Sequence, residues 1–317
     1  MNETRCAGQV VKRNWRREPG SSAGTLVSFC RTRRAVRTHR FGPVKRDVPV
    51  IGQGTWQIAD RGTGAARSAE VLRLGISLGM THIDTAELYG EAEIVVGRAI
   101  KDVPRDQVFI VSKVLPQNAS RKGTIEACKR SLRRLGVDYL DVLLIHWRGR
   151  YALAETLGAL EQLVDDGLIR ALGVSNFDVE DLEESLAALR RHGIACNQVL
   201  YHLQERSIEH AVMPFCVQHD IAVVAYSPFG HGKFLRPGSR GKRALEEIAQ
   251  RHNATPRQIA LAFLTQREMT FTIPKASSDE HVRENAAAGE IELTPDDVAA
   301  IDGAFPLGRR GGSLPTA

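Results

Sequence analysis

Four side chains that could act together on a polar double bond occur in the first half of the sequence. Asp84, Lys113 and His146 each follow a short apolar run, in GMTHID, VFIVSK and LLIH, and Tyr89 lies just beyond the first of these, in TAELYG. Tyrosine alone is a weak acid near neutral pH, because its unperturbed pKa is about 10. A neighbouring lysine lowers that pKa, and an aspartate paired with the lysine keeps it charged. The set therefore predicts a group that can protonate an oxygen atom.

The chemistry that fits such a set is carbonyl reduction, with Tyr89 as the general acid and His146 orienting the carbonyl oxygen. No side chain can supply a hydride, so a nicotinamide cofactor is expected. Each residue also has a structural explanation: a helix cap for Asp84, a solvent-reaching side chain for Lys113 and a core histidine for His146. Jointly these explanations are weaker, because an unpaired charge at the end of an apolar strand carries a desolvation cost.

The elements that must position these residues are short apolar runs that alternate with amphipathic stretches. The apolar runs predict eight strands, at 48–56, 80–86, 107–113, 140–147, 169–177, 195–202, 221–228 and 270–276. Helical patterns cover 64–79, 120–136, 153–167, 178–193 and 241–253. Eight such units in about 250 residues predict a single-domain α/β protein, a (β/α)₈ TIM barrel spanning residues 38–317, whose strand ends carry the chemistry. A doubly wound sheet is the alternative, but no GxGxxG motif supports it.

The positive charge of the chain is concentrated before the predicted barrel. The whole sequence carries a net charge of +6, whereas residues 1–40 alone hold ten basic and two acidic residues, a net +8 that leaves −2 for the rest. The barrel itself is therefore not expected to bind nucleic acid. Residues 1–37 are expected to be a basic, disordered extension or the product of a start codon placed too early, with a transit peptide or a polyanion-binding arm as the alternatives.

Cysteine usage and hydropathy narrow the class of protein further. The five cysteines form no CxxC pair, and no histidine cluster has zinc-ligand spacing, so no metal site is predicted. An odd number of cysteines favours a reduced, cytoplasmic protein. No apolar run is long enough to span a bilayer, so no membrane association is expected.

Taken together, the motifs resemble those of the aldo-keto reductase family, as a short-loop, bacterial-type member. The resemblance covers about residues 38–305 and rests on GMTHIDTAELYG, VFIVSK, LLIHW, GVSNF, NQVLYH, VVAYSP and IPKA. It implies that Asp84, Tyr89, Lys113 and His146 form a catalytic tetrad. It also implies hydride transfer from NADPH to aldehydes or ketones, with the cofactor extended across the mouth of the barrel.

By the same resemblance, the nicotinamide end of the cofactor has a defined set of contacts. Ser175, Asn176 and Gln198 would hold the carboxamide, Tyr226 would stack on the ring, and Ser227 would contact the pyrophosphate. The alternative for Tyr226 is an aromatic side chain that packs on the next helix.

At the adenosine end, the resemblance places Lys275 and Ser277 near the 2′-phosphate and Asn285 near adenine. Many members carry an arginine where this sequence has His281, a weaker partner for a phosphate. Arg283 is an alternative partner. NADP(H) is therefore the expected cofactor, with NAD(H) possible.

The resemblance also indicates the substrate side of the site. Thr55 is expected to contact the cofactor, and Trp56 and Trp147 to line a pocket for apolar or aromatic carbonyl compounds, with solvent-side packing as the alternative for the two tryptophans. The loops are short, which favours an open pocket and a monomer. A cofactor-sensing regulatory protein on the same barrel is the alternative function, since a fold does not determine a function.

Overall fold

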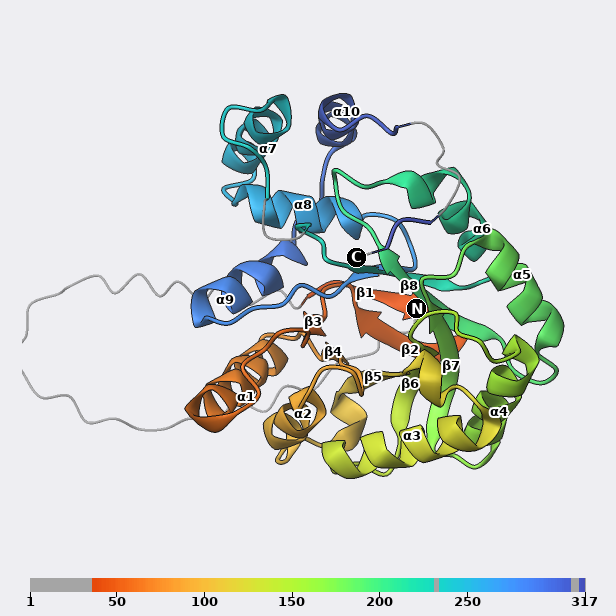
Figure 1. Ribbon diagram of the computed structural model, residues 1–317. Coiled ribbons are helices and arrows are strands. Elements are labelled where there is room, and N and C mark those ends of the chain that lie inside the picture. Colours follow the sequence, from red (N-terminus) through yellow and green to blue (C-terminus); the bar gives the residue numbers. More distant parts are fainter. Residues whose placement is uncertain (1–35, 231–233, 309–313, 317) are drawn as a thin grey trace, which may run out of the picture. The chain divides into compact units, whose positions relative to one another are not determined.

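The computed structural model describes residues 36–230, 234–308 and 314–316, and its centre is a parallel sheet of eight strands (Figure 1). The strands run in sequence order across the sheet: β3 (Gln53–Gly54), β4 (His82–Asp84), β5 (Phe109–Val114), β6 (Leu140–Ile145), β7 (Ile169–Ser175), β8 (Ile194–Leu200), β9 (Ala222–Tyr226) and β10 (Thr270–Thr272). Ile51 makes a parallel bridge to Thr272, and the Gly52 amide donates to the Thr272 carbonyl over 2.8 Å. These contacts join the first strand to the last, so the sheet closes into the predicted barrel.

Helices follow the strands and cover the outside of the barrel (Figure 1). They are α1 (Gly62–Ser77), α2 (Ala92–Ile100), α3 (Arg121–Leu135), α4 (Leu153–Asp165), α5 (Val179–Ala188), α6 (Val212–Gln218), α7 (Arg240–Arg251), α8 (Pro256–Leu264), α9 (Asp279–Ala288) and α10 (Pro295–Ala304). Four of the five predicted helices agree with these bounds to within a few residues. The outlying α10 packs against α7.

The predicted helix 178–193 is wrong in its last five residues, because α5 ends at Ala188. One carboxylate oxygen of Glu161 accepts hydrogen bonds from the backbone amides of Arg190, Arg191 and His192, at 3.0, 2.6 and 3.2 Å. These amides would otherwise donate to carbonyls one turn back in a continuing helix. The buried Glu161 on α4 thus holds residues 190–192 in a loop and ends the helix.

The predicted first strand, 48–56, is also wrong, because it divides between two structures. Val48 and Pro49 end β2 (Val44–Pro49), which forms an antiparallel hairpin with β1 (Thr38–Phe41), and only Gln53 and Gly54 form a barrel strand. Gly42 turns the hairpin at a φ of +51°, where a Cβ would lie 2.3 Å from a backbone oxygen.

Phe41 of the hairpin closes the amino-terminal end of the barrel. Its ring centroid lies 4.8 Å from those of both Phe109 and Phe271. Val36 and Arg37, the first described residues, also contact the barrel, through the buried Val36 side chain and an Arg37 amide that donates to the Gly289 carbonyl. Residues 1–35 of the predicted extension lie outside the described residues.

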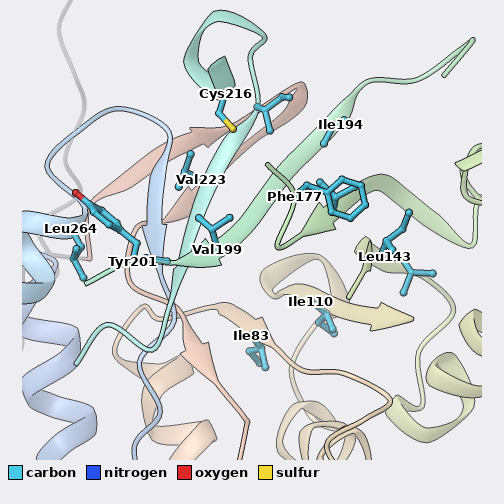
Figure 2. Close-up of a cluster of buried hydrophobic side chains, with 14 of the residues drawn as sticks. Ile83, Ile110, Leu143, Phe177, Ile194, Val199, Tyr201, Cys216, Val223 and Leu264 are labelled. Carbon is cyan, nitrogen blue, oxygen red and sulfur yellow. The ribbon is translucent and has the colours of Figure 1, made fainter. Parts of the chain in front are cut away.

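Outward-pointing strand side chains form the layer between the sheet and the helices. Ile83, Ile110 and Leu143, one from each of β4, β5 and β6, belong to this buried cluster (Figure 2). Complete burial of such a side chain contributes about 1.5–3 kcal/mol to folding. The cluster therefore also fixes which strand positions point inward, because side chains alternate along a strand.

Candidate active site

The alternation along β4, β5 and β6 brings three polar side chains to one rim of the barrel. Asp84 is one residue, and Lys113 and His146 are three residues, beyond the outward-facing residue of the same strand run. An odd separation places each of them on the inward face. All three are buried, with exposed fractions of 2%, 1% and 7%, at the carboxyl ends of the strands.

Tyr89 reaches the same rim from the loop after β4. Its hydroxyl lies 3.4 Å from Lys113 Nζ, and its ring centroid lies 5.7 Å from that of His146. Gly90 follows at a φ of +58°, and a Cβ there would lie 2.3 Å from the carboxylate of Asp60, which accepts the Glu91 amide. The turn that presents Tyr89 therefore requires a glycine.

Lys113 is the centre of this group. Its ammonium donates to Asp84 Oδ1 over 2.6 Å, to the Thr85 carbonyl over 2.9 Å and toward Tyr89. Burial alone would lower the pKa of Lys113, but the nearby Asp84 carboxylate and Tyr89 raise it above its ordinary value. The lysine consequently remains a cation near neutral pH.

The net pKa of Tyr89 differs from the expectation. Burial raises it above 10, and the Asp84 carboxylate adds to this, while Lys113 acts in the opposite direction. The prediction of a lowered pKa is therefore wrong for the net value in this structure, although Lys113 contributes with the expected sign. Tyr89 is a phenol near neutral pH, which is the form that can donate a proton.

His146 is a neutral imidazole. Burial and the positive charge of Lys113 lower its pKa to about 3. Its Nδ1 is buried without a hydrogen-bond partner among the described residues. Near neutral pH the ring can donate one hydrogen bond without carrying a charge.

The residues expected at the nicotinamide carboxamide form a hydrogen-bonded network with this group. Gln198 Nε2 donates to Asp84 Oδ2 over 2.7 Å, and Ser175 Oγ donates to the Gln198 carbonyl over 2.8 Å. Asn176 Nδ2 donates to the His146 carbonyl over 3.1 Å. The structure therefore brings all three expected residues beside the four at the rim.

Asn176 and Tyr226 are held in a defined arrangement. Asn176 adopts a φ of +61°, which is uncommon for any residue other than glycine, and its Oδ1 accepts the Tyr226 hydroxyl over 2.8 Å. Strained backbone of this kind persists where the surrounding contacts fix it. The hydrogen bond joins the carboxyl ends of β7 and β9.

These residues surround a cavity of about 750 Å³ at the carboxyl ends of the strands. Its lining includes twelve of the predicted site residues: Thr55, Trp56, Asp84, Tyr89, His146, Trp147, Ser175, Asn176, Gln198, Tyr226, Ser227 and Lys275. Lys113 is fully buried and does not itself line the cavity.

The residues expected at the adenosine end of the cofactor do not line one common cavity. His281 lines a second hollow of about 320 Å³. Ser277 is exposed and Asn285 is buried, and neither of these two described residues lines either hollow. Arg283, the alternative phosphate partner, also lines neither of these two hollows.

The mouth of the larger cavity exposes apolar side chains. Trp56 is 46% exposed, Leu88 47% and Trp147 38%. Leu88, Phe229 and Arg257 line this cavity but were not predicted from the sequence. Leu88 immediately precedes Tyr89, and this adjacency is the signal that could have identified it.

Glu87 also supports the site, and it too was not predicted from the sequence. Its Oε1 accepts the Leu115 amide over 2.8 Å and Asn118 Nδ2 over 2.9 Å, and its Oε2 pairs with Arg130. Glu87 thus ties the loop that carries Tyr89 to the loop that follows β5.

The described residues contain no group of three or more His, Cys, Asp or Glu side chains that could hold a metal ion. Among the same residues, no helix is both long and apolar enough to cross a membrane.

Comparison with known proteins gives a consistent result. Residues 50–305 match the sequence model of the Aldo/keto reductase family. The chain is 44% identical to methylglyoxal reductase YeaE of Escherichia coli over 82% of this chain and 92% of that protein, and 36% identical to glyoxal reductase of Bacillus subtilis over 81% and 88%. It resembles the crystal structure of an aldo-keto reductase from Klebsiella pneumoniae in complex with NADPH, with a TM-score of 0.83 and 41% identity over 90% of this chain and 100% of that one. The chain belongs to the aldo/keto reductase family.

Proposed function

We propose that the protein reduces small, uncharged aldehydes and ketones to alcohols with NADPH, and that Tyr89 is the general acid. The observation that carries this proposal is the buried Lys113 ammonium, which lies between the Asp84 carboxylate and the Tyr89 hydroxyl at the edge of the cavity. A charged lysine directed at a phenol stabilises the phenolate that forms when the phenol gives up its proton.

Each member of the tetrad then has a separate task. Tyr89 donates its proton to the carbonyl oxygen, and Lys113 stabilises the resulting phenolate. Asp84 keeps Lys113 charged and in place. His146, neutral because its pKa is lowered to about 3, donates a hydrogen bond to the same carbonyl oxygen and orients it.

The cavity suits a nicotinamide dinucleotide. Ser175, Asn176 and Gln198 offer hydroxyl and amide groups for a carboxamide, and Tyr226 offers an aromatic face. Lys275 adds a positive charge that a phosphate group requires. When bound, the reduced nicotinamide supplies the hydride that no side chain can provide. The crystal structure of the Klebsiella relative in complex with NADPH supports this choice.

The substrate side of the cavity favours uncharged compounds. Its mouth carries Trp56, Leu88 and Trp147, and the adjacent Arg148 has its guanidinium in ion pairs with Asp181 and Glu184, at 2.8 and 2.6 Å. At this end of the cavity an anionic substrate would therefore lose hydration without gaining a free cation from Arg148. The methylglyoxal and glyoxal reductases among the relatives support small dicarbonyl compounds as substrates.

The proposal is tested with three substrates that share an aldehyde group next to a second carbonyl carbon and differ in charge or in apolar bulk. The purified protein is assayed by NADPH absorbance with methylglyoxal, phenylglyoxal and anionic glyoxylate. We expect kcat/KM to be at least about tenfold higher for the two uncharged compounds, because a buried, unpaired carboxylate is costly. Equal or faster reduction of glyoxylate would contradict the preference for uncharged substrates. If the protein binds NADPH but reduces no carbonyl compound, the regulatory alternative is favoured.

Cofactor preference is measured in the same assay. We expect a higher kcat/KM with NADPH than with NADH, because Lys275 can pair with the 2′-phosphate. The margin should be modest, because His281 stands where many family members carry an arginine, and an imidazole cannot present an arginine's bidentate fork to a phosphate. An NADH value equal to or above the NADPH value would overturn the preference.

A further inference from the structure

The guanidinium of Arg257 packs against two aromatic rings that also contact each other. It is the second residue of α8, and its guanidinium carbon lies 5.0 Å from the centroid of Phe229 and 5.2 Å from that of Phe234. The two rings pack edge to face, 5.3 Å apart. Cation–π contacts of this kind hold the planar group in place without using its N–H donors.

Arg257 lies where the two hollows meet, because it lines both of them. It lines the larger cavity together with Ser227 and Lys275, and it lines the smaller hollow together with His281 and Glu284. A ligand that extends from the nicotinamide end of the site into the smaller hollow must therefore pass this side chain.

The guanidinium is also available to an anion. Across residues 36–230, 234–308 and 314–316, Arg257 takes part in no ion pair, whereas Lys242, which also lines the smaller hollow, lies 3.6 Å from Glu246. A guanidinium presents several N–H groups in a planar fork that matches a phosphate. Arg257 thus combines a guanidinium fixed by aromatic contacts, N–H donors outside any ion pair among the described residues, and a position on the lining of both hollows. This combination is typical of a phosphate-binding residue.

We propose that Arg257 binds a phosphate group of the dinucleotide cofactor. The proposal rests on the proposed function, since it assumes that a dinucleotide occupies both hollows. It assigns to α8 a cation that the sequence motifs did not identify. Arg283, on the same helix as His281, has no such role because it lines neither hollow.

The test measures binding rather than turnover. Dissociation constants for NADP⁺ and NAD⁺ are determined by titration calorimetry for the full chain and for Arg257→Ala, Arg257→Lys and Arg283→Ala. Arg257→Ala should weaken binding by about tenfold, the effect of one charge-assisted contact. Arg257→Lys should fall between Arg257→Ala and the unaltered protein, and Arg283→Ala should bind as the unaltered protein does.

The two cofactors identify which phosphate is bound. A loss confined to NADP⁺ would place Arg257 at the 2′-phosphate, and an equal loss for both would place it at the pyrophosphate. In either case raising the salt concentration should weaken binding less in Arg257→Ala than in the unaltered protein, because a screened charge contact has been removed.

Three results would overturn the proposal. The first is binding by Arg257→Ala within about twofold of the unaltered protein, a difference of about 0.4 kcal/mol. The second is weaker binding with an unchanged salt dependence, which would indicate stacking rather than a phosphate contact. The third is failure of the unaltered protein to bind either dinucleotide, which alone would also remove the proposed function.

Discussion

The ammonium of Lys113 lies 2.6 Å from Asp84 Oδ1, and both side chains are closed off from solvent. A buried ion pair of this kind is seldom a gain in stability, because removing two charges from water costs about as much as their attraction returns. Its position beside the Tyr89 hydroxyl gives it a function that an apolar pair could not have. The Lys113→Met variant and its matched control, described below, separate these two roles.

Replacing Tyr89 by phenylalanine removes the proposed acid and little else. We expect Tyr89→Phe to lower kcat for carbonyl reduction by about 10²- to 10⁴-fold, the usual contribution of a general acid. NADPH affinity should stay within about twofold, a difference of about 0.4 kcal/mol. Steady-state kinetics and calorimetry measure the two quantities. A variant that keeps most of its kcat would exclude Tyr89 as the acid.

Replacing Lys113 by methionine should damage both stability and catalysis. Asp84 is left as an unpaired buried charge, so the free energy of unfolding should fall by about 3–5 kcal/mol. Because Tyr89 also loses the neighbouring charge that lowers its pKa, kcat should fall by about 10²-fold or more. Denaturant unfolding and kinetics measure these effects.

The double variant Lys113→Met with Asp84→Asn is the matched control for that experiment. It removes the unpaired charge, while the amide oxygen of the introduced side chain can still accept a hydrogen bond from Gln198, so most of the lost stability should return. Activity should not return. Recovery of kcat in the double variant would mean that the ion pair serves folding alone.

The rim of the barrel was predictable from the sequence because two local rules act together. Parallel strands present their carboxyl ends at one edge, and side chains alternate along each strand. Asp84, Lys113 and His146 each satisfy both rules, so their meeting required no knowledge of the packing. Tyr89 lies in the short loop that follows Asp84, and this closeness in sequence keeps it near the same edge.

Features that depend on contacts distant in sequence could not be predicted. The end of α5 is set by the Glu161 carboxylate on another helix. The net pKa of Tyr89 depends on how deeply the folded chain buries it. Arg257 meets Phe229 and Phe234 only because α8 packs beside the loop after β9. None of these contacts leaves a periodic signal in the sequence.

His82 should make the fold sensitive to acid. It lies inside the barrel, with its ring centroid 5.5 Å from that of Phe109, and both ring nitrogens lack a partner among the described residues. Burial, helped by Lys113, lowers its pKa from 6.5 to about 3. Between these values the unfolded chain takes up a proton that the folded protein excludes, so stability falls as the pH falls, by about 1.4 kcal/mol per pH unit from this group.

The test of this prediction compares unfolding free energies from pH 7 toward pH 4 for the unaltered protein and His82→Leu. The variant cannot titrate at this position, so its stability should decline less steeply, with His146 still contributing in the same direction. Equal slopes for the two proteins would show that His82 is not the source. The carboxylates titrate in both proteins, so their contribution to the pH dependence cancels in the difference between the two slopes.

Arg37 should stabilise the barrel although it precedes the first strand. Its guanidinium donates to the carbonyls of Thr265, at 3.0 Å, and Ile291, at 3.4 Å, so it connects the chain before β1 to the segments after α8 and α9. Arg37→Ala leaves both carbonyls without this donor and should lower the free energy of unfolding by about 1–3 kcal/mol. Arg40→Ala is the control, because its pair with Asp220 is exposed and should contribute less than about 1 kcal/mol. Equal destabilisation by the two variants, measured by denaturant unfolding, would mean that the contacts of Arg37 add nothing specific to the fold.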